Sequence, residues 1–196
     1  MSEYILNLLP VTEAEKAEFE AIAPDAVHVY AGRRTLTSEQ IAQATVILGW
    51  PRPRDMKGAG RLKWFQTMWA GTDEYEGEGI LPSGVIFTSS SGSNRQSVAE
   101  HILAFTMALC RRLPAYARQG NWNDLGSERR VAGGTALIFG AGDLGGCIAR
   151  RLQAFGVKTV GVCRRTSPDR PGFDRLVRLD EAETLLPAAD FVLGAM

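Results

Sequence analysis

Cysteine is scarce in this chain of 196 residues, and the few cysteines lie far apart. Cys110, Cys147 and Cys163 form no Cys-x-x-Cys pair, and their number is odd. A disulfide framework needs paired cysteines, and a structural zinc site needs closely spaced ligands. We therefore expect neither a disulfide scaffold nor a metal site, and a reducing, cytoplasmic location.

The chain also lacks an excess of charge of either sign and any long apolar run. It carries 22 Lys and Arg against 22 Asp and Glu, whereas a general nucleic-acid-binding protein has a basic excess. With 45% hydrophobic residues it is too apolar for a disordered chain. No apolar run approaches the roughly 20 residues that span a bilayer, and MSEYILNLLP lacks the basic region of a signal peptide. We expect a soluble globular protein that binds neither nucleic acid nor membrane.

Short apolar runs alternate with helical patterns along the whole chain. This rhythm is typical of α/β proteins in which crossover helices join parallel strands. We expect strands over 4–9, 27–31, 45–50, 62–69, 85–90, 135–139, 158–163 and 190–196, and helices over 12–23, 37–44, 95–112, 143–155 and 179–189.

Apolar spacing also predicts which helix faces are buried. In the helix over 12–23 the predicted inner residues are Ala17, Phe19 and Ile22. In the helix over 95–112 they are Val98, Ile102, Phe105 and Leu109, and Ser97 with Glu100 has the spacing of a capping box.

A Gly-x-Gly-x-x-Gly motif follows the strand over 135–139 and opens the next helix. Gly140 allows a tight turn, Gly142 leaves room for a pyrophosphate to approach the backbone, and Gly145 lets the helix pack closely on the strand. The free N–H groups at the helix start attract phosphates. Because the motif lies in a strand–helix–strand unit of the right length, it predicts a dinucleotide site, although glycines that only form a tight turn remain the alternative.

The end of the next strand bears on which dinucleotide binds. An NAD site carries Asp or Glu there for the ribose 2′-hydroxyl, but this chain has Cys163, Arg164 and Arg165, and its next carboxylate is Asp169. Guanidinium groups attract a 2′-phosphate. The sequence therefore favours NADP(H) over NAD(H), with an ordinary solvated loop as the alternative interpretation.

These motifs resemble those of one enzyme family. FGAGDLGG followed by AFGVKTVGVCRR, and preceded by SVAEHILAFTMALCRRLPAYARQGNW, is similar to the D-isomer-specific 2-hydroxyacid dehydrogenases, especially the glyoxylate/hydroxypyruvate reductase branch. The resemblance covers the whole chain. WAGTDEY (69–75) resembles the family's substrate loop, and SVAEH (97–101) the start of its interdomain helix.

The resemblance implies two domains with an active site in the cleft between them. A flavodoxin-like substrate domain would cover 1–97, and a partial Rossmann domain would cover 98–196, with the interdomain helix at about 95–112. The residues expected to bind the cofactor are Gly140, Gly142, Asp143, Leu144, Gly145, Arg164 and Arg165.

The resemblance also suggests where the substrate binds. Backbone N–H groups of Ala70, Gly71 and Thr72 would hold the substrate carboxylate, because a glycine-containing turn exposes amides that bind anions. An ordinary turn is the alternative. Three further residues would lie near the nicotinamide: Asn94, Arg95 and Ser97. The complete enzyme would be a homodimer joined through its cofactor domain, with the helix over 95–112 as a contributor.

The chain departs from the family in its catalytic residues. The family uses an Arg, a Glu and a His from a later part of the Rossmann domain, and no position up to Met196 matches any of them. His101 and His28 are interpreted as packing residues. We expect 190–196 to be the third strand of its domain. Only the first half of the dinucleotide-binding fold would then be present, and this would leave 135–139 as an exposed edge. The chain alone should bind cofactor poorly and show no turnover.

Two classes of function follow. The first is an oxidoreductase that transfers hydride from NADPH to a small 2-keto acid such as glyoxylate or hydroxypyruvate. Within this class, NAD-dependent oxidation of phosphoglycerate or lactate is second. The alternative class is a non-catalytic, truncated protein that binds a dinucleotide or a partner.

Overall fold

The computed structural model describes residues 2–165 and 172–196, so Asp169 lies outside the described residues. The chain divides into two compact units, Met1–Ser93 and Asn94–Met196. This division lies four residues before the expected boundary at 97/98. In agreement with the prediction, the fold is α/β, and every described strand pairing is parallel.

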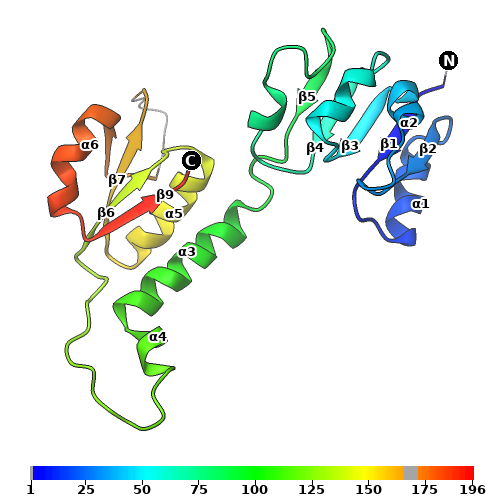
Figure 1. The fold of residues 1–196 in the computed structure, drawn as a ribbon. Coiled ribbons are helices and arrows are strands. Elements are labelled where there is room, and N and C mark those ends of the chain that lie inside the picture. The colour runs from blue at the N-terminus through cyan, green and yellow to red at the C-terminus, as the bar shows by residue number, and fades with distance from the viewer. Residues whose placement is uncertain (1, 166–171) are drawn as a thin grey trace. The chain divides into compact units, whose positions relative to one another are not determined.

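The first unit is a five-stranded sheet in the order β2-β1-β3-β4-β5 (Figure 1). Its strands are β1 (Tyr4–Asn7), β2 (Val27–Tyr30), β3 (Val46–Gly49), β4 (Trp64–Thr67) and β5 (Ile86–Thr88). The connections contain α1 (Glu13–Ile22), α2 (Ser38–Gln43) and the 3-10 helices η1 (Pro53–Gly58) and η2 (Asp73–Tyr75). This strand order is the flavodoxin-like order, so the predicted architecture is confirmed.

The core of the first unit lies around its central strands. Leu6, Ile47 and Phe65 are fully buried. The ring of Phe65 stacks on Phe87 of β5 and meets Tyr75 edge-on, with centroid distances of 5.0 and 4.8 Å. These contacts fix the loops that leave the carboxyl ends of the strands.

Helix α1 begins as expected but buries less than expected. Thr12 and Glu15 form a capping box at its start. The predicted inner face is wrong at two of its three residues: Ala17 is exposed and Ile22 is 82% exposed, whereas Phe19 is half-buried. The helix leads to the edge strand β2, which has a neighbouring strand on one side only and therefore offers little surface to cover.

The second unit is a four-stranded sheet in the order β8-β7-β6-β9 (Figure 1). Its strands are β6 (Thr135–Phe139), β7 (Lys158–Cys163), β8 (Arg175–Arg178) and β9 (Phe191–Gly194). Its helices are α3 (Arg95–Cys110), α4 (Leu113–Tyr116), α5 (Asp143–Ala154), α6 (Leu179–Leu185) and the 3-10 helix η3 (Leu186–Ala188). The strand–helix–strand unit β6–α5–β7 is Rossmann-like.

The strand order corrects two expectations about this sheet, one concerning β8 and one concerning β6. It was not predicted, so β9 is the fourth strand of the unit and not the third. The prediction that 135–139 forms an exposed edge is also wrong, because β6 pairs with β7 on one side and β9 on the other. Among the described strands, β8 and β9 form the two edges.

Helix α3 packs on α5 (Figure 1) through a face that matches the predicted one only in part, because Val98 is half-buried and Ile102 packs against the core of the unit. Phe105 and Leu109 are 56% and 67% exposed, and the buried residues are Ala99, Thr106 and Cys110. Small side chains let the two helices approach closely. The predicted capping box is absent from the described structure of this helix, because Asn94 occupies the N-cap and no side chain caps it.

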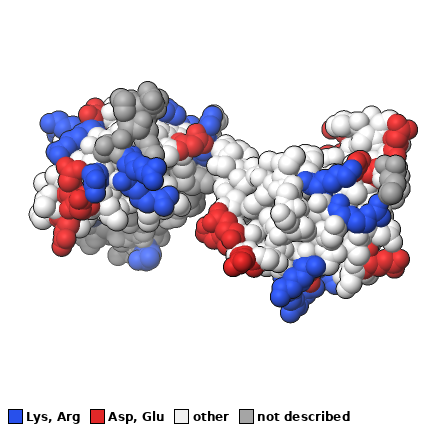
Figure 2. Space-filling view, turned by 90° about the horizontal axis from the view of Figure 1, so that it is seen from above, with Lys and Arg blue, Asp and Glu red and all other residues white. Residues whose placement is uncertain are grey.

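Charge is mixed on both units. On the face drawn in Figure 2, blue basic and red acidic groups are interspersed over each unit. This distribution agrees with the zero net charge and gives neither unit a broad field of one sign on that face.

Candidate functional site

A cavity of about 880 Å³ opens at the carboxyl ends of β6 and β7. Four of the residues expected to bind the cofactor line it: Gly140, Gly142, Arg164 and Arg165. The lining residues that were not named as cofactor-binding include the buried Cys163 and also Phe139, Leu179 and Ala195. Leu179 follows the unpredicted strand β8, and Ala195 follows β9, so neither could be found without the strand order.

The three glycines of the motif have different surroundings. Gly140 has a φ of +102°, and a Cβ there would lie 2.3 Å from the carbonyl oxygen of Ala195. A Cβ at Gly145 would lie 1.9 Å from the carbonyl oxygen of Gly140. A Cβ at Gly142 would meet nothing within 4 Å. Gly140 and Gly145 are thus required by the turn and the packing, whereas Gly142 faces open space.

The first turn of α5 presents backbone N–H groups beside this space. Gly142 is the N-cap of α5, and no side chain of the described residues caps the helix. The first N–H groups of a helix have no partner within the helix, and they carry its positive dipole end. Leu144 packs against the core of the unit, so the main chain is the part of the turn that can meet an anion.

Asp143, also expected to bind the cofactor, is held by another helix. Its Oδ1 accepts a hydrogen bond from Nη1 of Arg95 at 2.8 Å, and both side chains are about half exposed. Arg95 is the first residue of α3, and Asp143 is the first residue of α5. Both residues were candidates from the sequence, but no sequence signal indicated that they pair.

The end of β7 carries no carboxylate. Cys163 is buried, and its Sγ lies 3.6 Å from the carbonyl oxygen of Val177 in β8. The next two residues, Arg164 and Arg165, are exposed at the rim of the cavity. The structure thus brings the two guanidinium groups to the cavity and turns the thiol toward the sheet.

In the first unit, the expected substrate loop follows β4. Ala70 and Gly71 are exposed, and a Cβ at Gly71 would meet nothing within 4 Å. Within the described part of the chain, no group accepts a hydrogen bond from the backbone N–H of Ala70, Gly71 or Thr72. Three successive free amides can bind an anion.

Aromatic side chains support this loop. Trp69, directly before it, meets Trp50 edge-on at 5.2 Å, and the guanidinium of Arg33 lies 3.7 Å from the Trp50 ring centroid. The Tyr75 hydroxyl donates to the carbonyl oxygen of Pro51 at 2.6 Å, and burial raises the pKa of Tyr75. The loop is therefore anchored on both sides. No sequence signal indicated these anchors.

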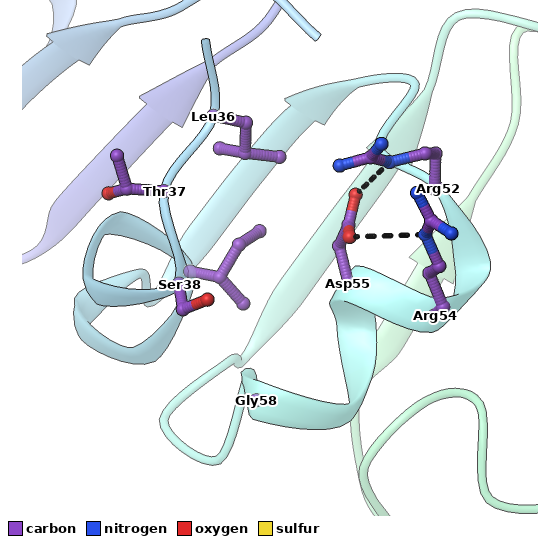
Figure 3. Close-up of a pocket in the computed structure, with 8 residues that line it drawn as sticks. Leu36, Thr37, Ser38, Arg52, Arg54, Asp55 and Gly58 are labelled. Atoms are coloured by element: carbon purple, nitrogen blue, oxygen red, sulfur yellow. Dashed lines mark hydrogen bonds and ion pairs between the residues drawn. The ribbon is translucent and has the colours of Figure 1, made fainter. Parts of the chain in front are cut away.

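A second, smaller pocket of about 220 Å³ lies in the first unit between the start of α2 and η1 (Figure 3). Nε of Arg52 donates to Asp55 at 2.7 Å, and Nε of Arg54 lies 3.9 Å from the same carboxylate. Because both guanidinium groups converge on Asp55, their charge is partly neutralised within the chain. This pocket contains none of the residues expected to bind cofactor or substrate.

Both histidines contact other residues of their own units. The His101 ring meets Phe105 edge-on at 4.6 Å on the exposed side of α3. Nε2 of His28 lies 2.9 Å from the carbonyl oxygen of Ala23. Ser97 is an exposed residue of the first turns of α3.

The structure holds no arrangement for a metal among its described residues, because no three His, Cys, Asp or Glu side chains there gather closely enough. Cys110, Cys147 and Cys163 are all buried free thiols. Within the same residues, no helix is both long enough and apolar enough to cross a membrane.

Comparison with known proteins places this geometry in context. Residues 103–196 match the family described as D-isomer specific 2-hydroxyacid dehydrogenase, NAD binding domain. An uncharacterized protein in the mprR 3′ region of Streptomyces coelicolor is 31% identical over 161 residues, which cover 77% of this chain and 55% of that protein.

Two further proteins extend the comparison. The D-3-phosphoglycerate dehydrogenase of Mycobacterium tuberculosis (strain ATCC 25618 / H37Rv) is 30% identical over 141 residues, which cover 70% of this chain and 26% of the enzyme. A D-isomer specific 2-hydroxyacid dehydrogenase family protein from Aeromonas salmonicida has the same fold. Its TM-score is 0.84 at 24% identity, over 100% of this chain and 64% of that protein.

Proposed function

Because residues 103–196 place this chain in the D-isomer-specific 2-hydroxyacid dehydrogenase family, we propose that it binds a nicotinamide dinucleotide as part of an oxidoreductase. The observation that carries the proposal is the open space at Gly142. A Cβ at Gly140 or Gly145 would clash with the backbone, whereas a Cβ at Gly142 would point into open space beside the first N–H groups of α5. A pyrophosphate fits such a helix start.

The cofactor of the proposed function is NADP(H). Arg164 and Arg165 are exposed at the cavity rim, directly after the strand end where an NAD site carries a carboxylate. A guanidinium group forms strong charge-assisted hydrogen bonds to a phosphate, and the buried Cys163 offers no acceptor to a ribose hydroxyl. The dinucleotide supplies the hydride when it is bound. The chain's part is to position it and to exclude water.

The proposed substrate is a small 2-keto acid such as glyoxylate or hydroxypyruvate. The free backbone amides of Ala70, Gly71 and Thr72 would hold its carboxylate, and Trp50 and Trp69 would keep their loop in place. In this proposal the first unit is the substrate domain and the second is the cofactor domain, with α3 as the interdomain helix. The proposed location is cytoplasmic.

The chain spans 55% of the Streptomyces relative and 64% of the Aeromonas protein. Turnover belongs to the longer polypeptide in our proposal, because no residue of this chain matches the family's catalytic Arg, Glu or His. The 196 residues alone would bind the dinucleotide weakly and would not reduce a 2-keto acid.

The proposed assembly is a homodimer joined through the second unit. Among the described residues of this unit, seven large apolar side chains are more than half exposed, and four of them lie in α3 or in the segment directly after it: Phe105, Leu109, Leu113 and Trp122. All four lie on or after α3, and from 117 to 134 the chain forms neither helix nor strand (Figure 1). Exposed apolar groups that gather on one part of a surface indicate an interface with another chain.

The cofactor proposal is tested by titrating NADPH and NADH into the longer polypeptide of this proposal, here called the full polypeptide, and following nicotinamide fluorescence. A double variant, Arg164→Met with Arg165→Met, should weaken NADPH binding at least about tenfold and change NADH binding less than about twofold, because only NADPH carries the 2′-phosphate. The matched control replaces two exposed arginines of the same unit, Arg118 and Arg130, by methionine. Equal losses for both dinucleotides would contradict the assignment.

The substrate proposal needs an activity assay with the same polypeptide. Glyoxylate, hydroxypyruvate and 3-phosphohydroxypyruvate are offered with each reduced dinucleotide, and oxidation is followed at the nicotinamide absorbance. Turnover of the first two with NADPH supports the proposed branch. Selective turnover of the phosphorylated keto acid with NADH would instead favour the phosphoglycerate-type alternative.

A further inference from the structure

We propose that Arg95 is a positioning residue for the dinucleotide, acting through Asp143 at the start of α5; this rests on the proposed function. The ion pair between them is short, 2.8 Å from Nη1 of Arg95 to Oδ1 of Asp143. It joins residues that lie 48 positions apart in the sequence and begin two different helices.

Asp143 creates an electrostatic conflict. An acidic side chain in the first turn stabilises a helix through the dipole. The same turn is the proposed phosphate site, where a bare carboxylate would repel the pyrophosphate. Because Asp143 is about half exposed, folding alone does not bury this charge away from a ligand.

Arg95 resolves the conflict by its placement. Its guanidinium cancels the charge of Asp143 and draws the carboxylate toward α3. The pair therefore converts an acidic helix start into one that accepts an anion.

The neighbouring contacts keep the two helix starts together. Arg151 of α5 lies 3.7 Å from Glu100 of α3, and the buried small residues of α3 lie in the same core cluster as Ile148 of α5. Asn94, the residue before Arg95, is where the second unit begins. The ion pair thus ties the point at which the chain enters this unit to the proposed phosphate site.

The test measures the affinity of the full polypeptide for NADPH and NADH in four variants. Arg95→Met should weaken both dinucleotides about threefold to tenfold, because the pyrophosphate is common to them and an exposed pair is modest in strength. Asp143→Asn should bind at least as well as the parent. The double variant should recover to within about twofold of Asp143→Asn. The control is Arg111→Met, which removes the partner of Glu128 in the same unit and should leave both affinities unchanged.

Two readouts separate positioning from simple stabilisation. The loss in Arg95→Met should shrink as sodium chloride rises, because salt screens the exposed carboxylate. Recovery in the double variant should occur in affinity and not in Tm. If Arg95→Met binds like the parent, or if the double variant is as weak as Arg95→Met, the inference is overturned while the proposed function stands. If the folded parent binds neither dinucleotide, both are overturned.

Discussion

Gly145→Ala should unfold the second unit at a much lower temperature than the parent chain. The added Cβ would lie 1.9 Å from the carbonyl oxygen of Gly140, although Cβ contacts under 3.0 Å essentially never occur. The start of α5 would have to move by about 1 Å, because the Gly140 carbonyl belongs to the backbone of a tight turn and cannot swing aside. Overpacking of this kind costs about 3 kcal/mol.

That loss translates into a large change in Tm. A domain of about 100 residues loses about 4–8 °C for each kcal/mol. The expected fall for Gly145→Ala is therefore roughly 12–24 °C. Calorimetry suits the measurement, because the chain has two compact units and each can give its own transition.

Gly142→Ala is the matched control within the same motif. Its Cβ would meet nothing within 4 Å, and its φ of −89° suits any residue. The expected cost is at most about 1 kcal/mol, from the poorer N-cap. The methyl would occupy the space proposed for the pyrophosphate, so dinucleotide affinity should fall about tenfold or more while the fold is kept.

The contrast between the two variants tests the different roles assigned to Gly145 and Gly142. One substitution should lower Tm, and the other should lower affinity at nearly unchanged Tm. If Gly145→Ala melts within a few degrees of the parent, the close packing of α5 on the Gly140 turn is wrong. If Gly142→Ala binds NADPH and NADH as well as the parent, the space beside Gly142 does not hold the pyrophosphate.

Three further predictions follow from local contacts. The backbone N–H of Thr159 lowers the pKa of Asp174. The carboxylate therefore stabilises the fold at neutral pH and loses this effect as pH falls below its ordinary pKa. In urea titrations, the difference in free energy of unfolding between the parent and Asp174→Asn should shrink from about pH 5 to about pH 3. Thr12→Ala should remove about 1 kcal/mol of local stability, seen as faster amide exchange in α1 at unchanged Tm, since no residue of α1 is buried. Phe105→Glu should shift sedimentation from dimer to monomer without lowering the monomer's Tm; a monomeric parent would contradict the proposed interface.

Much of the fold could be predicted because its signals are local. Strands β6 and β7 have the predicted bounds, since each is a mostly apolar run bordered by turn-forming or charged residues. Strand β8 was missed because Arg175–Arg178 has only two apolar residues between charged ends. The buried face of α3 was predicted only in part, because apolar side chains lie on more than one side of the helix. Its burial depends on which side can approach α5 closely.

The same distinction between local signals and long-range packing applies to the candidate site. The glycine motif and the two arginines are contiguous in sequence, so their chemistry could be recognised there. Leu179 and Ala195 reach the cavity only through the pairing of β7 with β8 and of β6 with β9. The pair of Arg95 and Asp143 depends on the packing of α3 against α5, which no spacing rule gives.

The strand order of the second unit also affects how this unit folds during synthesis. The ribosome adds about 5–20 residues per second. Strand β6 ends at Phe139 and can pair with β7 soon afterwards, but its other neighbour, β9, begins only at Phe191. One hydrogen-bonding edge of β6 therefore has no partner strand for roughly 3 to 10 s of synthesis. During that interval the unpaired edge of β6 can pair with a strand of another chain, so we expect the nascent chain to depend most on chaperones at this stage.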